Sequence, residues 1–498
     1  MRLYKFIFAS LIVIFTSFAV SAQTKEFPAT AFGKLVQEWM KLVDGGTEAE
    51  IKSFVENNFS TAGLKSQSVT ETVFIMRKLQ KQSGGLEILS VSPPSGPYGM
   101  TMKVKARRGE NYATIAVGED SREPGKIIGF GIWKENPPNK LTKINWEEKP
   151  LSESRMIEEI KRQVEKRAAD GNFSGVVLIA KDDKILLHVA HGLAERSFNV
   201  PNSLNTKFNL ASVGKMFTAT AIAQLVKQGK IAYDDKLIKH LPDFPNKAAA
   251  EKISIHQLLT HTAGMGTLFE SPGYERLRRY RSSWDEVSAF ANEELFFEPG
   301  ARWRYSNAGY VTLGAVIERV SGMNYVDYVR ENIFKPLGMN DTDSYSHDEV
   351  VPNMSVLYIQ SPDDPLGIEP YVADHILAGF RGNGEGGGYS TALDLFKFAR
   401  SYRTGRLLGA DAQEVLVTPK VDEDGKGNNF WGYGVKQTTV NGEIVRGHSG
   451  GGRTHLQMLW NSGYTIIVQT NTVPPPVTAL SNEIVQFMTR QIALRDKK

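Results

Sequence analysis

Ser212-Val213-Gly214-Lys215 is the only S-x-x-K tetrapeptide in this 498-residue chain, and it stands where a helix is expected to begin. The residues that follow, Met216 to Lys227, are Ala-rich and lack Gly and Pro, and Gly229 then supplies a stop signal. Because residues i and i+3 share a helix face, the Lys215 amine is expected beside the Ser212 hydroxyl. A serine hydroxyl needs such a neighbour to take its proton, and burial lowers the pKa of a lysine toward that role.

The tetrapeptide alone is weak evidence for a catalytic serine, because roughly two S-x-x-K matches are expected by chance in a chain of this length. The expected helix start strengthens this evidence, because the free N–H groups of the first turn favour a developing oxyanion. The interpretation therefore depends on what else the chain carries.

Tyr305-Ser306-Asn307 is the only Y-x-N in the sequence, and it lies in a turn-rich stretch before the apolar run from Val311 to Val320. A lysine ammonium near a phenol favours the phenolate, which makes Tyr305 a candidate general base. Asn307 is a candidate hydrogen-bond donor to a substrate. The structural alternative is a buried tyrosine beside an ordinary turn.

A third motif, His448-Ser449-Gly450-Gly451, lies between two strand-like runs, Glu443 to Arg446 and Thr454 to Trp460. Glycines at this place would let a substrate backbone lie close against an edge strand.

Taken in order, the three motifs resemble those of the serine β-lactamase and penicillin-binding-protein superfamily, which are S-x-x-K, Y-x-N, and K-T-G or H-x-G. The resemblance covers about residues 154 to 495 and is closest to the class C β-lactamase-related branch. That branch includes D-alanyl-D-alanine carboxypeptidases, D-aminopeptidases and esterases. Three further stretches support it: Gln257 to Gly264, Lys335 to Met339, and Gly386 to Leu395.

The resemblance implies a role for each motif residue. Ser212 would be the acylated nucleophile, and Lys215 and Tyr305 would share proton transfer. Asn307, His448 and Gly450 would contact the substrate. The backbone N–H groups of Ser212 and Gly451 would form the oxyanion hole.

His448 departs from the lysine that the third motif often carries. An imidazole is smaller than an ammonium and only partly charged near neutral pH, so it would hold a substrate carboxylate less firmly. This departure favours ester or D-peptide substrates over efficient β-lactam hydrolysis.

Two rival interpretations use the same glycines. Residues 447–451 also fit G-x-S-x-G, the nucleophile elbow of α/β-hydrolases, but that elbow requires a following helix and the sequence predicts a strand there. The glycine-rich serine motif of trypsin-like proteases is also similar, yet those proteins are all-β.

Arg403-Thr404-Gly405 imitates a cationic third motif, although its place at the end of the Asp394–Tyr402 segment predicts a helix C-cap.

Other chemistry is weakly indicated. The chain contains no H-E-x-x-H and no Walker loop. His188 and His191 are three residues apart in a strand-like run, which places them on opposite faces, so no metal site and no cofactor are predicted. Residues 382–388 are rich in Gly and predict either a loop that lines the cleft or a structural turn.

The first 22 residues read as a secretory signal peptide, with Arg2 and Lys5 before the apolar run Phe6–Val20 and small residues at Val20-Ser21-Ala22. Its cleavage would leave no membrane span, and the protein is expected to be exported, periplasmic or secreted. The chain has no cysteine, so a lipoprotein anchor and disulfides are excluded. The formal net charge is +4; removing this segment takes away two bases and no acid and leaves +2, which does not favour nucleic-acid binding.

Four segments are predicted: the signal peptide 1–22, an α+β domain 23–135, a Pro- and charge-rich linker 136–153, and the serine hydrolase domain 154–498. In the small domain, helix-like spacing over 28–45, 47–57 and 69–82 precedes strand-like runs at 86–91, 100–106, 113–117 and 127–133. This order looks like the nuclear-transport-factor-like cone fold. The domain would be a ligand-binding module or a passive spacer.

The larger domain is predicted to be α+β, with strands from both of its ends in one antiparallel sheet and helical insertions between them. Predicted elements are a helix at 156–168, strands at 175–180, 184–188, 433–439, 443–446, 454–460 and 464–469, and a final helix at 477–494. Asn441-Gly442 is a strong hairpin turn. This order agrees with a β-lactamase-like sheet flanked by helices and a helical subdomain.

The function expected from these patterns is an exported serine hydrolase acting through an acyl-enzyme. Its partner would be a small-molecule or peptide substrate: an ester, a D-amino-acid peptide or amide, or a β-lactam, with peptidoglycan fragments among the candidates. The alternative is a catalytically idle binding or scaffold protein that keeps the fold.

Overall fold

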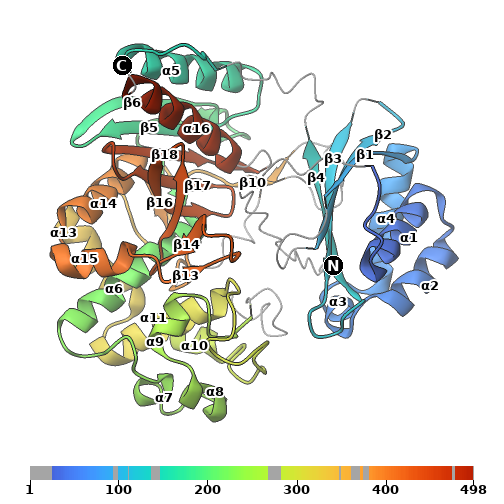
Figure 1. Cartoon of the computed structure of the whole chain (residues 1–498), viewed down its shortest axis with the longest axis horizontal. Coiled ribbons are helices and arrows are strands. Elements are labelled where there is room, and N and C mark those ends of the chain that lie inside the picture. Colours follow the sequence, from blue (N-terminus) through green and yellow to red (C-terminus); the bar gives the residue numbers. More distant parts are fainter. Residues whose placement is uncertain are drawn as a thin grey trace. The chain divides into compact units, whose positions relative to one another are not determined.

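The computed structural model (Figure 1) describes residues 25–92, 99–109, 111–135, 146–266, 282–346, 349–359, 371–373, 381–473 and 477–496. Two compact units are present, and most of the first precedes residue 145 while most of the second follows it. The predicted signal peptide and the first ten residues of the predicted linker, 136–145, lie outside the described residues. No helix of the described ranges is long and apolar enough to cross a membrane.

The first unit begins with helices and ends with a sheet, as its sequence predicts. The helices are α1 (Ala31–Gly45), α2 (Glu48–Asn58), α3 (Thr61–Ser66) and α4 (Val69–Ser83). The sheet has the order β1-β2-β3-β4 and consists of β1 (Leu86–Ser92), β2 (Met100–Ala106), β3 (Tyr112–Glu119) and β4 (Ile127–Glu135). All neighbouring strands are antiparallel. Helix α3 was not predicted, because six residues are too few to show a helical period.

One apolar core joins the helices of this unit to the sheet. Trp39 of α1 and Met76 of α4 are fully buried in it with Met102 and Ile115 of the strands. The residues of β2 alternate between buried and more exposed positions, so one face of that strand covers the helices. The resemblance to the cone fold stays a prediction.

The second unit is built on an eight-stranded antiparallel sheet with the order β13-β14-β15-β16-β17-β18-β5-β6. The two N-terminal strands are β5 (Gly175–Lys181) and β6 (Lys184–His191). The six others are β13 (Val421–Asp422), β14 (Asn429–Trp431), β15 (Lys436–Val440), β16 (Glu443–Gly450), β17 (Thr454–Leu459) and β18 (Tyr464–Thr470). Pairing of β18 with β5 joins the two ends of the domain in one sheet, as predicted.

Helices cover both faces of this sheet (Figure 1). On one face, α5 (Glu153–Ala169) and α16 (Val477–Asp496) pack on Val177 and Ile179. The neighbouring residues Val176 and Leu178 point the other way, into the core that holds α6 (Lys215–Lys227) and α14 (Ala392–Thr404). A strand buried on both faces reads as a continuous apolar run, which is what residues 175–180 show.

The remaining elements lie mostly between β6 and β13. The longest helix is α11 (Asn307–Ser321), and the shorter ones are α7 (Leu237–His240), α8 (Lys247–Lys252), α9 (Ile255–Leu259), α10 (Ser283–Val287), α12 (Tyr325–Val329), α13 (Lys335–Leu337) and α15 (Ala410–Val417). The short strands β9 (Phe208–Asn209) and β12 (Tyr389–Ser390) pair with each other. The predicted sheet with helical insertions is therefore confirmed.

Several boundaries differ from the prediction, and three of the differences have a clear position in the structure. Helix α5 begins at Glu153, three residues early, because Ser152 caps it through the Arg155 N–H. Strand β15 begins only at Lys436, since Gly434 before it has a φ of +70° and turns the chain. Strand β16 does not end at Arg446 but continues to Gly450.

Gly447 provides a test of the close strand packing in this sheet. A Cβ at this position would lie 2.0 Å from the carbonyl oxygen of Leu456 on β17. We expect Gly447→Ala to reduce the free energy of unfolding by about 1–3 kcal/mol, measured by urea and thermal denaturation. Gly129→Ala in β4 is the control, because no atom lies within 4 Å of the added carbon there. Equal stability of the two variants would contradict this account of the packing.

Candidate active site

Ser212 lies in a tight 3₁₀ turn, Ala211–Gly214, and α6 begins only at Lys215. The expected regular helix start is therefore replaced by a tighter one, although it still brings positions i and i+3 together. Ala211 has a φ of +43°, which is strained for a residue with a side chain. Its N–H donates to the Asn209 Oδ1 at 3.0 Å, which helps to hold the turn. Strain of this kind persists only where surrounding contacts enforce it.

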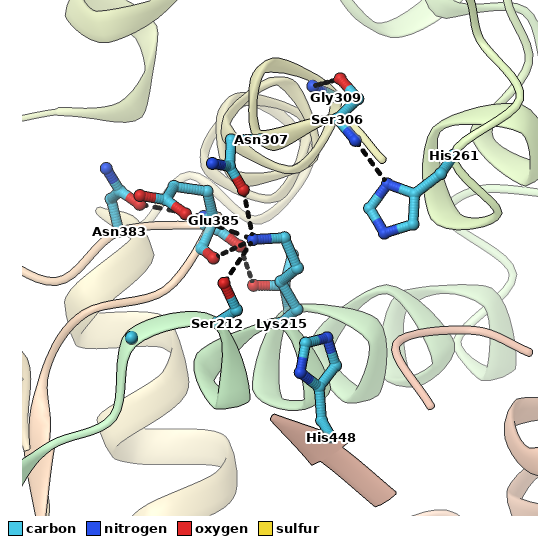
Figure 2. A network of polar contacts seen from close by, with 12 residues as sticks. Ser212, Lys215, His261, Ser306, Asn307, Gly309, Asn383, Glu385 and His448 are labelled. Carbon is cyan, nitrogen blue, oxygen red and sulfur yellow. Dashed lines mark hydrogen bonds and ion pairs between the residues drawn. The ribbon is translucent and has the colours of Figure 1, made fainter. Parts of the chain in front are cut away.

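Lys215 is completely buried, and its ammonium is surrounded by oxygen atoms (Figure 2). The Nζ donates to the Asn307 Oδ1 at 2.7 Å and to the backbone carbonyl of Glu385. The Glu385 Oε2 lies 3.2 Å from the Nζ, and the Ser212 Oγ lies 3.5 Å away. The lysine is thus within reach of the serine hydroxyl, as the spacing of the tetrapeptide predicts.

Burial lowers the pKa of Lys215 to about 8, because a charged amine loses its hydration inside the protein. The Glu385 carboxylate acts in the opposite direction, through its charge and its hydrogen bond. A pKa of about 8 means that a useful fraction of the amine is neutral near physiological pH. The site can therefore supply a proton acceptor for Ser212.

Tyr305 lies beside the same lysine, with the Nζ 4.9 Å from the centre of its ring. Its phenol lies near the Ser212 side chain, and the residue is 7% exposed. Burial raises the pKa of Tyr305 far above its ordinary value, and the contact with Ser212 offsets only part of this. The sequence argument that the ammonium favours the phenolate is wrong here, since desolvation outweighs it. Tyr305 is in place as a neutral phenol that can donate or relay a proton.

Asn307 is the first residue of α11, and Ser306 caps this helix by accepting the Gly309 N–H at 3.0 Å. The cap fixes the backbone of Asn307, so its side-chain oxygen stays directed at Lys215. Because the oxygen is engaged, the amide NH₂ is the group left for a substrate acceptor.

His448 projects from β16 toward the helix of Lys215 (Figure 2). Its Nδ1 is 2.8 Å from the carbonyl oxygen of Ser449 and donates to it, so the Nε2 carries the lone pair. The Nε2 is buried and has no hydrogen-bond partner among the described residues. Burial lowers the pKa of His448 to about 3, and the Lys215 charge adds to this effect. The expectation of a partly charged imidazole is therefore wrong, because the ring is neutral at pH 7.

Gly450 and Gly451 lie against the nucleophile turn. A Cβ at Gly450 would be 2.1 Å from the carbonyl oxygen of Leu210, so only glycine allows this approach. Gly451 has a φ of +50°, in the left-handed region that glycine adopts most easily. Strand β15 pairs with β16 only as far as Gly447, which leaves the next three residues of β16 as a local edge. The structure thus brings all seven predicted site residues into one neighbourhood.

The rival serine is placed differently. Ser449 alternates with His448 along β16, and its Oγ lies 3.2 Å from the Thr478 Oγ1 of α16, on the opposite face of the sheet. Strand β17 follows it, where an α/β-hydrolase elbow requires a helix. Arg403 and Thr404 end α14, and Gly405 caps it with a φ of +63°, as predicted.

Glu385 is the principal site residue that the sequence did not reveal. Residues 382–388 were predicted to line the cleft or form a turn, and they do reach Lys215 (Figure 2), but nothing in the spacing singled out this carboxylate. Its N–H donates to the Asn383 Oδ1 at 2.9 Å, and the Asn383 amide donates to the Glu286 Oε2 at 2.6 Å. Burial raises the pKa of Glu286 well above its ordinary value, with the Glu385 charge adding to the rise.

His261 is a second residue whose role was missed, although it lies in a stretch that supports the family resemblance. Its Nδ1 accepts the Ser306 N–H at 3.1 Å, and its ring lies 4.4 Å from that of Tyr305, centre to centre. Trp431 of β14 packs on the same imidazole with ring centres 4.7 Å apart. These ring contacts pack His261 against Tyr305. Burial lowers the pKa of His261 well below its usual value, so this ring is also neutral.

No group of three or more His, Cys, Asp or Glu residues that could hold a metal ion occurs in the part of the chain that the structure describes. The groups gathered around Ser212 are those of a nucleophile, a lysine base and a phenol. Such a set can perform acyl transfer through a serine ester.

Comparison with known proteins agrees with this arrangement. A family model described as Beta-lactamase matches residues 160–487. Penicillin-binding protein 4* of Bacillus subtilis (strain 168) is 32% identical over 303 residues, which is 56% of this chain and 63% of that protein. Esterase EstB of Burkholderia gladioli is 38% identical over 179 residues, 33% of this chain and 45% of that protein. The chain thus spans less than two thirds of the length of either relative.

A solved structure shares the fold. The D-stereospecific amidohydrolase from Streptomyces sp. superposes with a TM-score of 0.54 at 26% identity. The match covers 63% of this chain and 93% of that one.

The buried neutral histidines predict an acid-sensitive fold. His455 of β17 is 3% exposed, and burial lowers its pKa to about 3, while the unfolded chain would have the ordinary value near 6.5. The unfolded state therefore binds more protons between these values, so stability that is complete above about pH 6.5 is lost as the pH falls. One such histidine accounts for a loss of about 2 kcal/mol by pH 5.

We expect His455→Gln to flatten the dependence of the unfolding free energy on pH between pH 7 and pH 5, measured by urea titration. The glutamine can keep the contact with the Gln457 side chain, which lies 2.6 Å from the His455 Nε2. Identical slopes in both proteins would show that His455 does not titrate in this way.

Proposed function

This chain belongs to the beta-lactamase family, and on that premise we propose that it is an exported serine hydrolase that forms an acyl-enzyme at Ser212. The observation that carries the proposal is the contact of the buried Lys215 amine with the Ser212 hydroxyl, 3.5 Å apart, beside the Tyr305 phenol. Export rests on the sequence pattern of the first 22 residues.

In the proposed reaction, the Ser212 Oγ attacks the substrate carbonyl while neutral Lys215 accepts its proton. The backbone N–H groups of Ser212 and Gly451 would receive the developing oxyanion, at the place where the Gly450 backbone lies against the nucleophile turn. Tyr305, held as a phenol, would pass a proton to the leaving group. Water would then hydrolyse the serine ester, with the same groups moving protons in reverse.

The charges around the serine favour a substrate without a carboxylate beside the scissile bond. His448 is neutral and presents a lone pair, and the Glu385 carboxylate is 22% exposed. A substrate carboxylate next to Glu385 would be repelled by its charge. A substrate carboxylate next to His448 would face a lone pair and find no hydrogen-bond donor. Esters and D-amino-acid amides or peptides therefore fit better than penicillins. D-peptides from peptidoglycan belong to the candidate set only if their free carboxylate lies away from these groups.

The relatives support the same substrate classes. One carries the name esterase and another the name D-stereospecific amidohydrolase, and both descriptions refer to cleavage of an ester or amide of an acyl group. The competing proposal is a catalytically idle protein that retains the fold. The intact neighbourhood of serine, lysine and tyrosine favours the enzyme.

A fluorophosphonate probe with peptide mapping, together with a panel of nitrophenyl esters, D-Ala-D-Ala peptides and nitrocefin, tests the proposal. We expect the label on Ser212 and turnover of at least one substrate, both lost in Ser212→Ala. Tyr305→Phe should lower kcat by about 10²- to 10⁴-fold, because proton transfer to the leaving group is removed. Ser449→Ala is the control and should keep its activity. Labelling of Ser449, or a normal kcat in Tyr305→Phe on every substrate, would contradict the assignment.

The charge of residue 448 gives a test of substrate preference. We expect His448→Lys to raise kcat/KM for a penicillin or a carboxylate-bearing D-peptide, relative to a neutral ester, by about tenfold or more. The reason is that an ammonium donates a charge-assisted hydrogen bond where the neutral imidazole offers only a lone pair. His448→Gln, which stays uncharged, is the control. An equal loss of kcat/KM with both substrate classes would mean that His448 serves only to pack against its neighbours, such as Trp431.

A further inference from the structure

The Lys215 ammonium faces more acceptors than it has protons to donate. Three N–H groups meet four oxygens: one from Asn307, two from Glu385 and one from Ser212. The Ser212 Oγ is the most distant of the four, at 3.5 Å. In the ammonium form, the lysine is therefore held mainly by Asn307 and Glu385, and it has no lone pair for the serine proton.

Building on the proposed function, we propose that Glu385 is a positioning residue that holds Lys215 in its ammonium form and sets the pH above which Ser212 gains its proton acceptor. The geometry that carries this is the 3.2 Å separation between the Glu385 Oε2 and the fully buried Nζ. A carboxylate this close favours the charged amine.

The proton balance gives the carboxylate two consequences. Before reaction, the Nζ must release one proton to solvent, and Glu385 opposes this step because its charge would lose its partner. During attack, the bond between the Ser212 Oγ and the substrate carbonyl carbon forms while the Ser212 proton moves to the Nζ. The ammonium that results again lies beside Glu385, which stabilises it.

Several contacts fix the backbone around Glu385, and this fixes the position of its carboxylate beside Lys215. Asn383 and Glu286 anchor the residues before it. The carbonyl oxygen of Gly384 accepts from the Thr218 Oγ1 of α6 at 2.6 Å. A Cβ at Gly386 would lie 2.3 Å from the carbonyl oxygen of Ala211, so the loop rests directly on the nucleophile turn.

The tyrosines and histidines around this pair are neutral at pH 7 and do not replace the carboxylate. Those that face Lys215 are Tyr305, Tyr310, His261 and His448. The titratable groups that face the Glu385 carboxylate, besides the lysine, are Glu286, Tyr305 and Tyr325. Burial raises the pKa values of the tyrosines and lowers those of the histidines, which keeps these rings uncharged. Burial also raises the pKa of Glu286 well above its ordinary value.

The test is the pH dependence of kcat/KM for p-nitrophenyl butyrate, an uncharged ester, in the wild type and Glu385→Gln. In the wild type, activity should rise with pH around the Lys215 pKa of about 8. Glutamine keeps the shape and the backbone carbonyl but removes the charge, so the rising limb should move down by roughly 1–3 pH units. The variant should therefore reach its plateau at a lower pH, and the plateau itself should be lower, because the ammonium formed during attack loses the carboxylate that stabilises it.

Two further variants make the result specific. Glu385→Ala tests the same loss of charge if the glutamine protein folds poorly, and thermal denaturation checks the folding of both. Glu331→Gln removes a carboxylate that pairs with Lys335 at 2.6 Å on an exposed helix surface, so it changes the net charge equally. Its pH profile should match that of the wild type.

A rising limb that stays in place in both Glu385 variants would overturn the proposal. A lower plateau with an unmoved limb would also overturn it, because the carboxylate would then handle a proton itself. The proposed function fails differently: the wild type would show neither turnover nor fluorophosphonate labelling that depends on Ser212 at any pH, and the inference about Glu385 would fall with it.

Discussion

The burial of one lysine ammonium is the constraint on which the rest of the second unit depends. Lys215 is excluded from solvent, and an ammonium in that position must recover in hydrogen bonds what it loses in hydration. Its acceptors come from the nucleophile turn, from the start of α11 and from the glycine-rich loop before α14. The start of α11 and the glycine-rich loop lie 92 and 170 residues from the lysine along the chain, so the hydrogen bonds of the ammonium are complete only when these distant parts of the chain have come together.

Glycines make that assembly sterically feasible. The backbones of β16 and of the loop before α14 approach the nucleophile turn so closely that a Cβ at Gly450 or Gly386 would overlap a carbonyl oxygen of Leu210 or Ala211. Gly434 approaches the backbone of Lys215 itself in the same way. Motif glycines that were predicted to contact the substrate are thus also required for three chain segments to meet around one side chain.

The same burial distributes the acid–base roles. Desolvation lowers the pKa of the lysine and raises that of the neighbouring tyrosine, which separates a proton acceptor from a proton donor within one pocket. The imidazole of His448 becomes neutral for the same reason. Lys215 and Glu385 form an ion pair inside this site, and their contact decides when the base is free to act. The acid–base properties of the site are in this sense a property of the packing.

Local sequence was sufficient for whatever depends on near neighbours. The closeness of Ser212 and Lys215, six of the eight strands of the large sheet and the C-cap after α14 follow from spacing, apolar period and turn residues within a few positions. The motif order also carried the family resemblance. Tertiary structure alone decided the contact of Glu385 with Lys215, the support of Tyr305 by His261, and the extension of β16 to Gly450. It also decided the charge states, because a pKa in the interior depends on burial and on groups brought together from distant parts of the chain, and neither is written in the spacing of residues.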